Sequence, residues 1–367
     1  MAEAPPVGAL RETAAFFLKL GTTAFGGPAA HLALMEDEAV RRRGWLSREE
    51  LLDLMGACSL IPGPSSTQVA MLVGHRRAGW RGLLLGGLCF ILPAALLTLC
   101  LAWAYQRFGH LPGTAALLAG VKPVILAVVV QALWGLGRVV TRRPPMLGLA
   151  LLALSASLFG LHPALVMLGA ATLPFLAALA RRGTAAGLAA LPLLPAVTLT
   201  SLFGLFAKFG VLVFGSGYVL LAYLQADLVD RLHWLTQAQL LDAIAAGQVT
   251  PGPVFTTATF IGYLVQGVPG AAVATAGIFL PSFLMTLALA PLLPRLRRSG
   301  LASAFLDGAN AGALGLMAAV SWVFLRTAVA GWMGLAILAL AAALLLRWRV
   351  NPTWLILGGA AAGLLLR

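Results

Sequence analysis

An internal repeat constrains this chain more than any other feature, because the second half carries the motifs of the first half at one constant offset in numbering. In each half, a lysine lies within one apolar segment and a Pro-Gly-Pro sequence interrupts another. The first copy contains Phe17-Leu-Lys19-Leu-Gly21, Phe25-Gly26-Gly27, Trp45-Leu46, Leu51-Leu52-Asp53 and Pro62-Gly63-Pro64, and the second contains Phe206-Ala-Lys208-Phe-Gly210, Phe214-Gly215-Ser216, Trp234-Leu235, Leu240-Leu241-Asp242 and Pro251-Gly252-Pro253. The repeat therefore predicts two units of the same fold.

The composition is that of an integral membrane protein. The chain is 60% hydrophobic and only 10% charged, whereas soluble domains carry about 25% charged residues. Its net charge of +13 does not indicate a nucleic-acid partner, because the Lys and Arg residues fall in short clusters between apolar segments. That spacing is the positive-inside pattern of a multi-pass protein of the cell (inner) membrane, so the expected surroundings are the lipid bilayer.

Apolar segments of the length that spans a bilayer, about 20 residues, occur throughout the chain. They cover roughly residues 14–35, 82–106, 113–136, 145–160, 162–180, 199–222, 269–294, 301–325, 330–346 and 352–366. Two further apolar segments, 49–74 and 238–265, are interrupted by the Pro-Gly-Pro sequences. The sequence therefore predicts an all-α integral membrane fold with about ten transmembrane helices and two re-entrant or broken segments.

The repeat also predicts how the chain is divided. Residues 1–182 form the first repeat, 183–198 a linker and 199–367 the second repeat. If the Pro-Gly-Pro segments enter and leave on one side, the basic clusters share one membrane face and each half has five spans. An odd number of spans makes this an inverted-topology tandem repeat. If the broken segments instead cross fully, each half has six crossings and the repeats are parallel.

The Pro-Gly-Pro sequences are expected to begin new half-helices at Pro64 and Pro253, because proline suits the first helical position. The first amides of such a helix lack intrahelical partners and bind anions. The donors and backbone of the predicted oxyanion site are Gly63, Ser65, Ser66, Thr67, Gln68, Gly252, Thr256 and Thr257. The alternative is a structural kink in which Ser and Thr side chains satisfy the freed backbone.

Three lysines lie within apolar segments. Lys19 and Lys208 occupy matching positions, and in an inverted repeat they could face each other across the midplane around a dianion. The alternative for each is snorkelling to the interface. Beyond the Pro-Gly-Pro sequences the repeat continues at an offset of 188 residues instead of 189, so Lys122 has Asn310 as its counterpart. This asymmetry suggests a supporting role at the site or a counter-charge to a carboxylate such as Asp53.

Glycine clusters follow both repeated lysines, at Gly26-Gly27 and at Gly215-Ser216. Small residues there let the backbone approach a ligand or a neighbouring helix. Both interpretations predict a bend in the first helix of each half.

The sequence contains no pattern that indicates an enzyme. Its five histidines lack metal-ligand spacing, and it has neither a Walker A nor a GxSxG sequence. We therefore expect no metal, no cofactor and no catalytic residue.

At this point the chain resembles the chromate ion transporter family in its long, duplicated form. The resemblance rests on Phe25-Gly26-Gly27-Pro28, Pro62-Gly63-Pro64 with Gln68, and Gly74-His-Arg76-Arg77-Ala-Gly79 in the first half, and on Phe214-Gly215-Ser216-Gly217-Tyr218, Pro251-Gly252-Pro253-Val254 and Phe279-Leu-Pro281-Ser282-Phe283 in the second. Ser216 departs from the glycine usual in the family. The resemblance implies chromate export, with sulfate as a close structural mimic.

The sequence leaves several functional alternatives open. The predicted activity is export of chromate, with or without sulfate, by alternating access at a midplane oxyanion site. The alternatives are a transporter for sulfate or another anion, a passive anion channel and, more remotely, a membrane-embedded enzyme. The coupling ion and the oligomeric state are also open, with a homodimer as one option.

Overall fold

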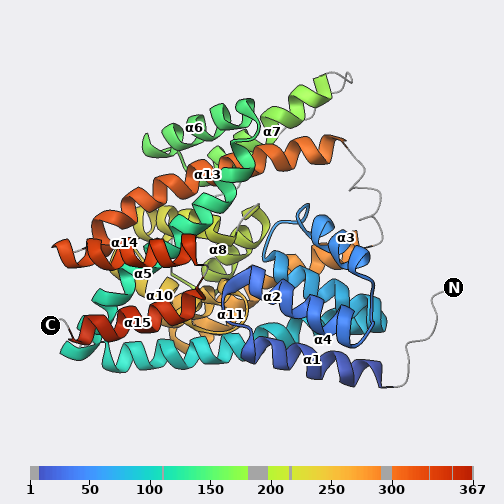
Figure 1. Cartoon of the computed structure of the whole chain (residues 1–367), viewed down its shortest axis with the longest axis horizontal. Helices are drawn as coiled ribbons and strands as arrows, with labels where there is room; N and C mark the ends of the chain where they lie inside the picture. The colour runs from blue at the N-terminus through green and yellow to red at the C-terminus, as the bar shows by residue number, and fades with distance from the viewer. Residues whose placement is uncertain are drawn as a thin grey trace. The chain divides into compact units, whose positions relative to one another are not determined.

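The computed structural model describes residues 8–109, 111–180, 197–214, 217–290, 300–329, 331–348 and 350–365, and over these residues the secondary structure is helical (Figure 1). Most of the predicted linker, 183–198, lies outside the described residues. The chain forms two compact units. Unit 1 comprises residues 1–109, 202–211 and 246–294, and unit 2 comprises residues 110–201, 212–245 and 295–367. Each unit thus combines segments of both sequence repeats, while the repeat boundaries themselves remain a prediction.

Unit 1 begins with a helical hairpin formed by α1 (Ala9–Thr23), α2 (Gly27–Met35) and the π-helix η1 (Glu36–Arg42). Arg77 pairs with Glu12 at 2.7 Å, near the start of α1, and its guanidinium lies 5.5 Å from the ring centre of Trp45, just after η1. The rings of Phe16 and Trp45 are also 5.5 Å apart. The two ends of the segment therefore lie together, whereas an unbroken helix of this length would separate them by about 50 Å.

This hairpin corrects the expectation that residues 14–35 form one span. The reversal lies between α1 and α2, where Gly26 and Gly27 have φ values of 107° and 77°. This left-handed region is open to glycine at little cost, and Pro28 lies in the first turn of α2, where proline is tolerated. The predicted bend in the first helix is confirmed here, and it is sharp enough to return the chain to its starting side.

The first Pro-Gly-Pro segment folds back in the same way. Helix α3 (Arg48–Cys58) starts with a capping box in which Ser47 and Glu50 satisfy each other's backbone amides. The chain then passes through Pro62-Gly63-Pro64 and begins α4 (Ser65–Phe108). Arg76 of α4 forms an ion pair of 2.7 Å with Glu50, so the start of α3 and the end of the first arm of α4 are neighbours.

Helix α4 itself reverses at Ala78–Gly79, where φ and ψ leave the helical region. A methyl group built on Gly74 would lie 2.2 Å from the carbonyl oxygen of Gly82, so the two arms touch through glycine. In the second repeat, α11 (Thr257–Leu289) reverses at Gln266–Gly267 with nearly the same φ and ψ values. The two reversals occupy corresponding places in the two copies, so the repeat extends beyond the Pro-Gly-Pro sequences.

The second arms of α4 and α11 run antiparallel to each other within unit 1. Near the start of its second arm, α4 approaches the Phe283 ring at Gly87. Near its end, Tyr105 packs against Phe260 at 5.4 Å between ring centres. Phe260 belongs to the first arm of α11, whose neighbouring residue Thr259 contacts Thr275 of the second arm at 2.7 Å. The start of the second arm of α4 therefore lies near the end of α11, and its end lies near an earlier part of α11, as expected for antiparallel helices.

Unit 2 contains the apolar helices α5 (Pro112–Val140), α6 (Pro144–Leu158), α7 (Pro163–Ala180), α13 (Gly300–Ala328), α14 (Gly331–Arg347) and α15 (Pro352–Leu365). In it, α13 packs along α6 and α7, and in Figure 1 α13 is the orange helix beside these two green ones. Helix α5 packs against α13, α14 and α15. The remaining elements of the chain are α8 (Leu199–Leu212), η2 (Gly217–Val219), α9 (Leu220–Leu224), η3 (Gln225–Arg231), α10 (Gln237–Val249) and η4 (Val254–Thr256).

Four helical stretches in the described part of the chain are long and apolar enough to cross a membrane: Ser65–Phe108, Gly113–Val140, Val254–Ala288 and Gly300–Ala328. Five further apolar helices are 10–17 residues long, including α6, α14 and α15. The all-helical membrane architecture is thus confirmed in outline.

The hairpin of α4 provides a test of the packing. Gly74→Ala should lower the thermal midpoint of the purified protein by disrupting the hairpin, because the new methyl would overlap the Gly82 backbone. Gly135→Ala is the matched control, since Gly135 lies in a helix with nothing within 4 Å of its added methyl, and alanine is the better helix former. Equal midpoints for the two variants would contradict the hairpin.

Candidate anion-binding site

Both Pro-Gly-Pro breaks lie in unit 1, and each packs against the first helix of the opposite repeat. The amide of Gly252 donates to the carbonyl of Ala24 at 3.0 Å, and a methyl built on Gly252 would lie 3.4 Å from the carbonyl oxygen of Gly21. Reciprocally, a methyl built on Gly63 would lie 3.5 Å from the carbonyl oxygen of Gly210. Glycine is needed at both breaks because φ is positive there, 110° at Gly63 and 88° at Gly252, and because an added methyl would collide with Ser282 Oγ at the first break and with the Ala94 side chain at the second.

The first break ends in a helix N-terminus that points into this contact region. Pro64 is the N-cap of α4, so the helix begins at Ser65, one residue later than predicted. The amides of Thr67 and Gln68 donate to the Pro64 carbonyl at 2.9 and 3.0 Å, which leaves the amides of Ser65 and Ser66 as those the helix cannot satisfy. Ser65 is exposed, whereas Ser66 and Thr67 are buried.

The second break is more tightly closed on itself. Pro253 is the N-cap of the short η4 turn, and α11 begins only at Thr257. The Thr256 hydroxyl donates to the Pro253 carbonyl at 2.9 Å, and the Thr257 hydroxyl to the Val254 carbonyl at 2.8 Å. At this break the structure shows the structural kink that the sequence left open as an alternative to an anion site, because Thr side chains bond to the backbone carbonyls.

His31 joins these elements, and the sequence analysis did not single it out as a site residue. Its imidazole is fully buried; Nε2 lies 3.3 Å from the Ala24 carbonyl and Nδ1 3.1 Å from the Ser66 hydroxyl. Since a carbonyl only accepts, Nε2 carries the proton and Nδ1 accepts from Ser66. Ala24 thus accepts from both His31 and Gly252. The repeat gave no signal for this residue, because its counterpart is Leu220.

The two repeated lysines occupy different environments. Lys19 is exposed on α1. The pKa of Glu38 is lowered mainly by its hydrogen bond from Arg43, and the nearby charges of Arg43, Lys19 and Arg42 lower it further. Lys208 is half-buried on α8, and its ammonium lies 5.5 Å from the ring centre of Phe209. Both lysines belong to unit 1.

Of the two predicted glycine clusters, the structure describes the first. Gly26 and Gly27 lie at the apex of the α1–α2 hairpin, next to Ala24 and therefore close to the second break. Gly215 and Ser216 lie outside the described residues.

Lys122 belongs to unit 2 and forms an ion pair of 3.2 Å with Asp242. The carboxylate that pairs with Lys122 is therefore that of Asp242, which is the repeat counterpart of the expected Asp53. The side chains are 18% and 5% exposed, so both charges are largely removed from solvent. Asn310 is half-buried on α13, also in unit 2. The predicted site residues thus divide between the two units.

A second charged cluster in unit 2 was not predicted. Asp227 is fully buried and pairs with Arg231 at 2.7 Å and with His162 at 3.2 Å. His162 Nδ1 accepts from the amide of Ala164, so Nε2 is the nitrogen that donates to Asp227. This arrangement anchors η3 to the start of α7.

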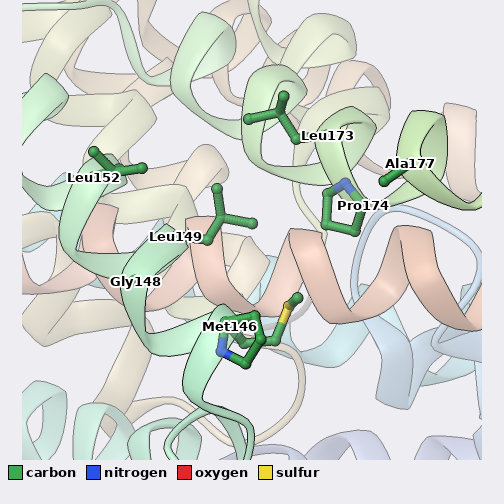
Figure 2. A pocket seen from close by; sticks show the side chains of 8 residues that line it. Met146, Gly148, Leu149, Leu152, Leu173, Pro174 and Ala177 are labelled. Atoms are coloured by element: carbon green, nitrogen blue, oxygen red, sulfur yellow. The ribbon is translucent and has the colours of Figure 1, made fainter.

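Figure 2 shows an apolar cavity of about 600 Å³ in unit 2. Its lining comes from α6 and α7 and includes Leu149, Leu152, Leu173 and Pro174. Since it offers an anion neither charge nor hydroxyl groups, we exclude it as the anion site.

The fold and the paired helix breaks define a multi-pass membrane protein built from a duplicated unit. Comparison with known proteins identifies the family: the chromate transporter family matches residues 11–175 and again 200–364, so this chain belongs to it. The two matched stretches are offset from each other as Lys208 is from Lys19. Membership agrees with the predicted location in the cell (inner) membrane.

Three relatives cover most of the chain. A chromate transport protein of Cupriavidus metallidurans is 34% identical over 97% of this chain and 92% of its own length. A probable chromate transport protein of Synechococcus elongatus is 33% identical over 85% and 84%, and a chromate transport protein of Pseudomonas aeruginosa is 31% identical over 98% and 93%. No solved structure matches the chain.

The Lys122–Asp242 pair gives a test of unit 2. Lys122→Met should lower the free energy of unfolding by about 3 kcal/mol, because it removes the ammonium that pairs with the largely buried Asp242 carboxylate. Adding Asp242→Asn should restore most of this loss. The control is Arg143→Met, which removes the pair of Arg143 with Asp307, whose side chains are 61% and 31% exposed, and should cost below about 1 kcal/mol. The measurement is denaturant unfolding. If Lys122→Met and Asp242→Asn change the free energy of unfolding additively, the ion pair is contradicted.

Proposed function

We propose that this chain transports chromate across the cell membrane and exports it from the cytoplasm. Its membership of the chromate transporter family supports chromate as the substrate. Two relatives that this chain matches over most of their length are named chromate transport proteins, which supports the same substrate. The same comparisons favour a transporter over an enzyme. Sulfate, which has the same shape and charge, is the competitor we expect.

The observation that carries this proposal is the reciprocal packing of the two breaks in unit 1. The amide of Gly252 bonds to Ala24, and Gly63 approaches Gly210, so each repeat contributes a helix start to one region. A helix N-terminus carries about half a positive charge and presents free amides. Two such ends, with the hydroxyls beside them, can hold a tetrahedral dianion without a metal or cofactor.

We further propose that the repeats are inverted and that the Pro-Gly-Pro segments re-enter the membrane side they came from. The Glu50–Arg76 pair, which joins the two ends of the first segment, supports re-entry. The antiparallel second arms of α4 and α11 support inversion, because counterpart helices run antiparallel across a two-fold axis in the membrane plane. Alternating access then follows from movement of one repeat's arms against the other's.

Export agrees with the energetics of the membrane potential. Moving a dianion out of an inside-negative cell releases about 4.6 kcal/mol of free energy per 100 mV, twice the value for a single charge. The basic residues Arg43 and Arg77 lie at the same end of unit 1, both packed against Trp45. The positive-inside rule assigns this end to the cytoplasm.

Within the site, the helix starts hold the anion and the lysines supply positive potential. Lys208 is the stronger contributor in this proposal, because it is half-buried whereas Lys19 is exposed. A charge shielded from solvent interacts more strongly.

The proposal is tested by chromate uptake into inside-out vesicles. Lys208→Ala should lower kcat/KM for uptake about tenfold, the equivalent of about 1.4 kcal/mol, whereas Lys208→Arg should keep most of it. Lys19→Ala should have the smaller effect.

Two further measurements separate the alternatives. Sulfate added outside the vesicles should inhibit uptake competitively, and preloaded unlabelled chromate should accelerate entry of labelled chromate by counterflow. Unchanged uptake in Lys208→Ala would contradict the role of this lysine. Uptake without counterflow, at the rate of an open pore, would contradict a transporter.

A further inference from the structure

Four buried polar atoms around the first break have no hydrogen-bond partner within the part of the chain that the structure describes. They are Thr67 Oγ1, Gln68 Oε1, Ser282 Oγ and Thr286 Oγ1. All four residues are fully buried and belong to unit 1. An unsatisfied buried polar group lowers stability, so a cluster of them requires an explanation.

Two of these side chains converge on the break itself. A methyl built on Gly63 would lie 2.2 Å from Ser282 Oγ and 3.2 Å from Gln68 Nε2. The Gln68 amide group is held in place because Nε2 donates to the Pro62 carbonyl at 2.6 Å. Thr286 lies one turn after Ser282 on α11 and so shares its helix face.

The second break has the same Pro-Gly-Pro sequence but satisfies its hydroxyls. Ala94 takes the place of Ser282 there, and Thr98 takes the place of Thr286. Thr98 Oγ1 lies 3.3 Å from Thr250 Oγ1 and 3.4 Å from Thr256 Oγ1, and Thr250 and Thr256 in turn donate to backbone carbonyls.

One substitution between the repeats accounts for much of this difference. At the first break the position of Thr250 is occupied by Ile61, which offers no hydroxyl to Thr286. The first break therefore keeps three buried hydroxyls without hydrogen-bond partners among the described residues, where apolar side chains would fold more stably.

The chemistry of the cluster favours an anion over a cation. Hydroxyl groups and the free amides of Ser65 and Ser66 are donors, and the start of α4 is the positive end of its dipole. No carboxylate belongs to the cluster, and Gln68 Oε1 is an acceptor without a hydrogen-bond partner in the described part of the chain. Neutral donors at a helix start are how proteins bind tetrahedral oxyanions.

We propose that the two breaks differ in role: the first alone holds the tetrahedral oxyanion, and the second is a self-bonded structural counterpart. The anion accepts hydrogen bonds from the amides of Ser65 and Ser66 and from the hydroxyls of Thr67, Ser282 and Thr286. This inference rests on the proposed function and narrows its anion site from both helix starts to the start of α4 alone. Because the hydroxyls are buried, the α11 arm withdraws from Gly63 when the anion enters.

The test compares matched variants at the two breaks. Ser282→Ala with Thr286→Val gives the first break the apolar character of Ala94, while Thr98→Val removes the hydroxyl that is already bonded at the second. Calorimetry with chromate and with sulfate gives Kd for each purified protein, and the thermal midpoint is measured without anion. For the first-break variant, we expect Kd to rise at least tenfold for both anions and the midpoint to rise. For Thr98→Val, we expect Kd to stay within twofold and the midpoint to fall.

The outcomes separate this inference from the proposed function. If the wild-type protein binds either anion and the first-break variant binds it equally well, only the inference fails. A lower midpoint with unchanged Kd in that variant would also overturn it, since the hydroxyls would then be structural. If the wild-type protein binds neither chromate nor sulfate, the proposed function fails and this inference fails with it.

Discussion

Direct backbone contact between the two repeats is the constraint on which the rest of unit 1 depends. Gly252 bonds to the Ala24 carbonyl and approaches Gly21, while Gly63 lies beside Gly210. Any side chain at either break would collide with Ser282 or Ala94. The helix starts that follow the breaks are therefore held close to the first helix of the opposite repeat. The same contact explains why α1 ends at Thr23, since its last turn must leave the Ala24 carbonyl open to two donors, Gly252 and His31.

Much of this arrangement was predictable from sequence because it is local or repeated. The constant offset between matching motifs predicted the duplication, and the two family matches carry the same offset. Proline chemistry predicted breaks at Pro62-Gly63-Pro64 and Pro251-Gly252-Pro253, which end and restart helices in the structure. The bend at Gly26-Gly27 was also predicted, although its size was not. Hydropathy alone cannot distinguish one long span from a hairpin of two shorter helices.

The features that sequence did not predict depend on contacts between distant segments. Lys122 pairs with Asp242 rather than Asp53, and the two aspartates are equivalent in the repeat, so no local pattern could choose between them. His31 has no polar counterpart in the second half, so a search by repeat overlooks it. The unsatisfied hydroxyls of Ser282 and Thr286 become visible only when α11 is placed beside Gly63. In a duplicated protein, positions where the copies differ thus carry information that the repeat itself hides.

Charge is distributed to match this division of roles. The arginines near Trp45 are paired with Glu12, Glu38 and Glu50 at one end of unit 1, which suits an interface between bilayer and water. In the proposed site the substrate charge is met mainly by helix dipoles, hydroxyls and Lys208. Most of these donors are neutral, and burying them costs less free energy than burying charged side chains would.

The most direct test of this account is an experimental density map of the protein with chromate bound. The account predicts anion density at the start of α4, within hydrogen-bond distance of the Ser65 and Ser66 amides, with α3 and α4 separated by a non-helical break at Gly63. Chromate held only among the arginines near Trp45, or density for an unbroken helix through Pro62 and Pro64, would contradict it.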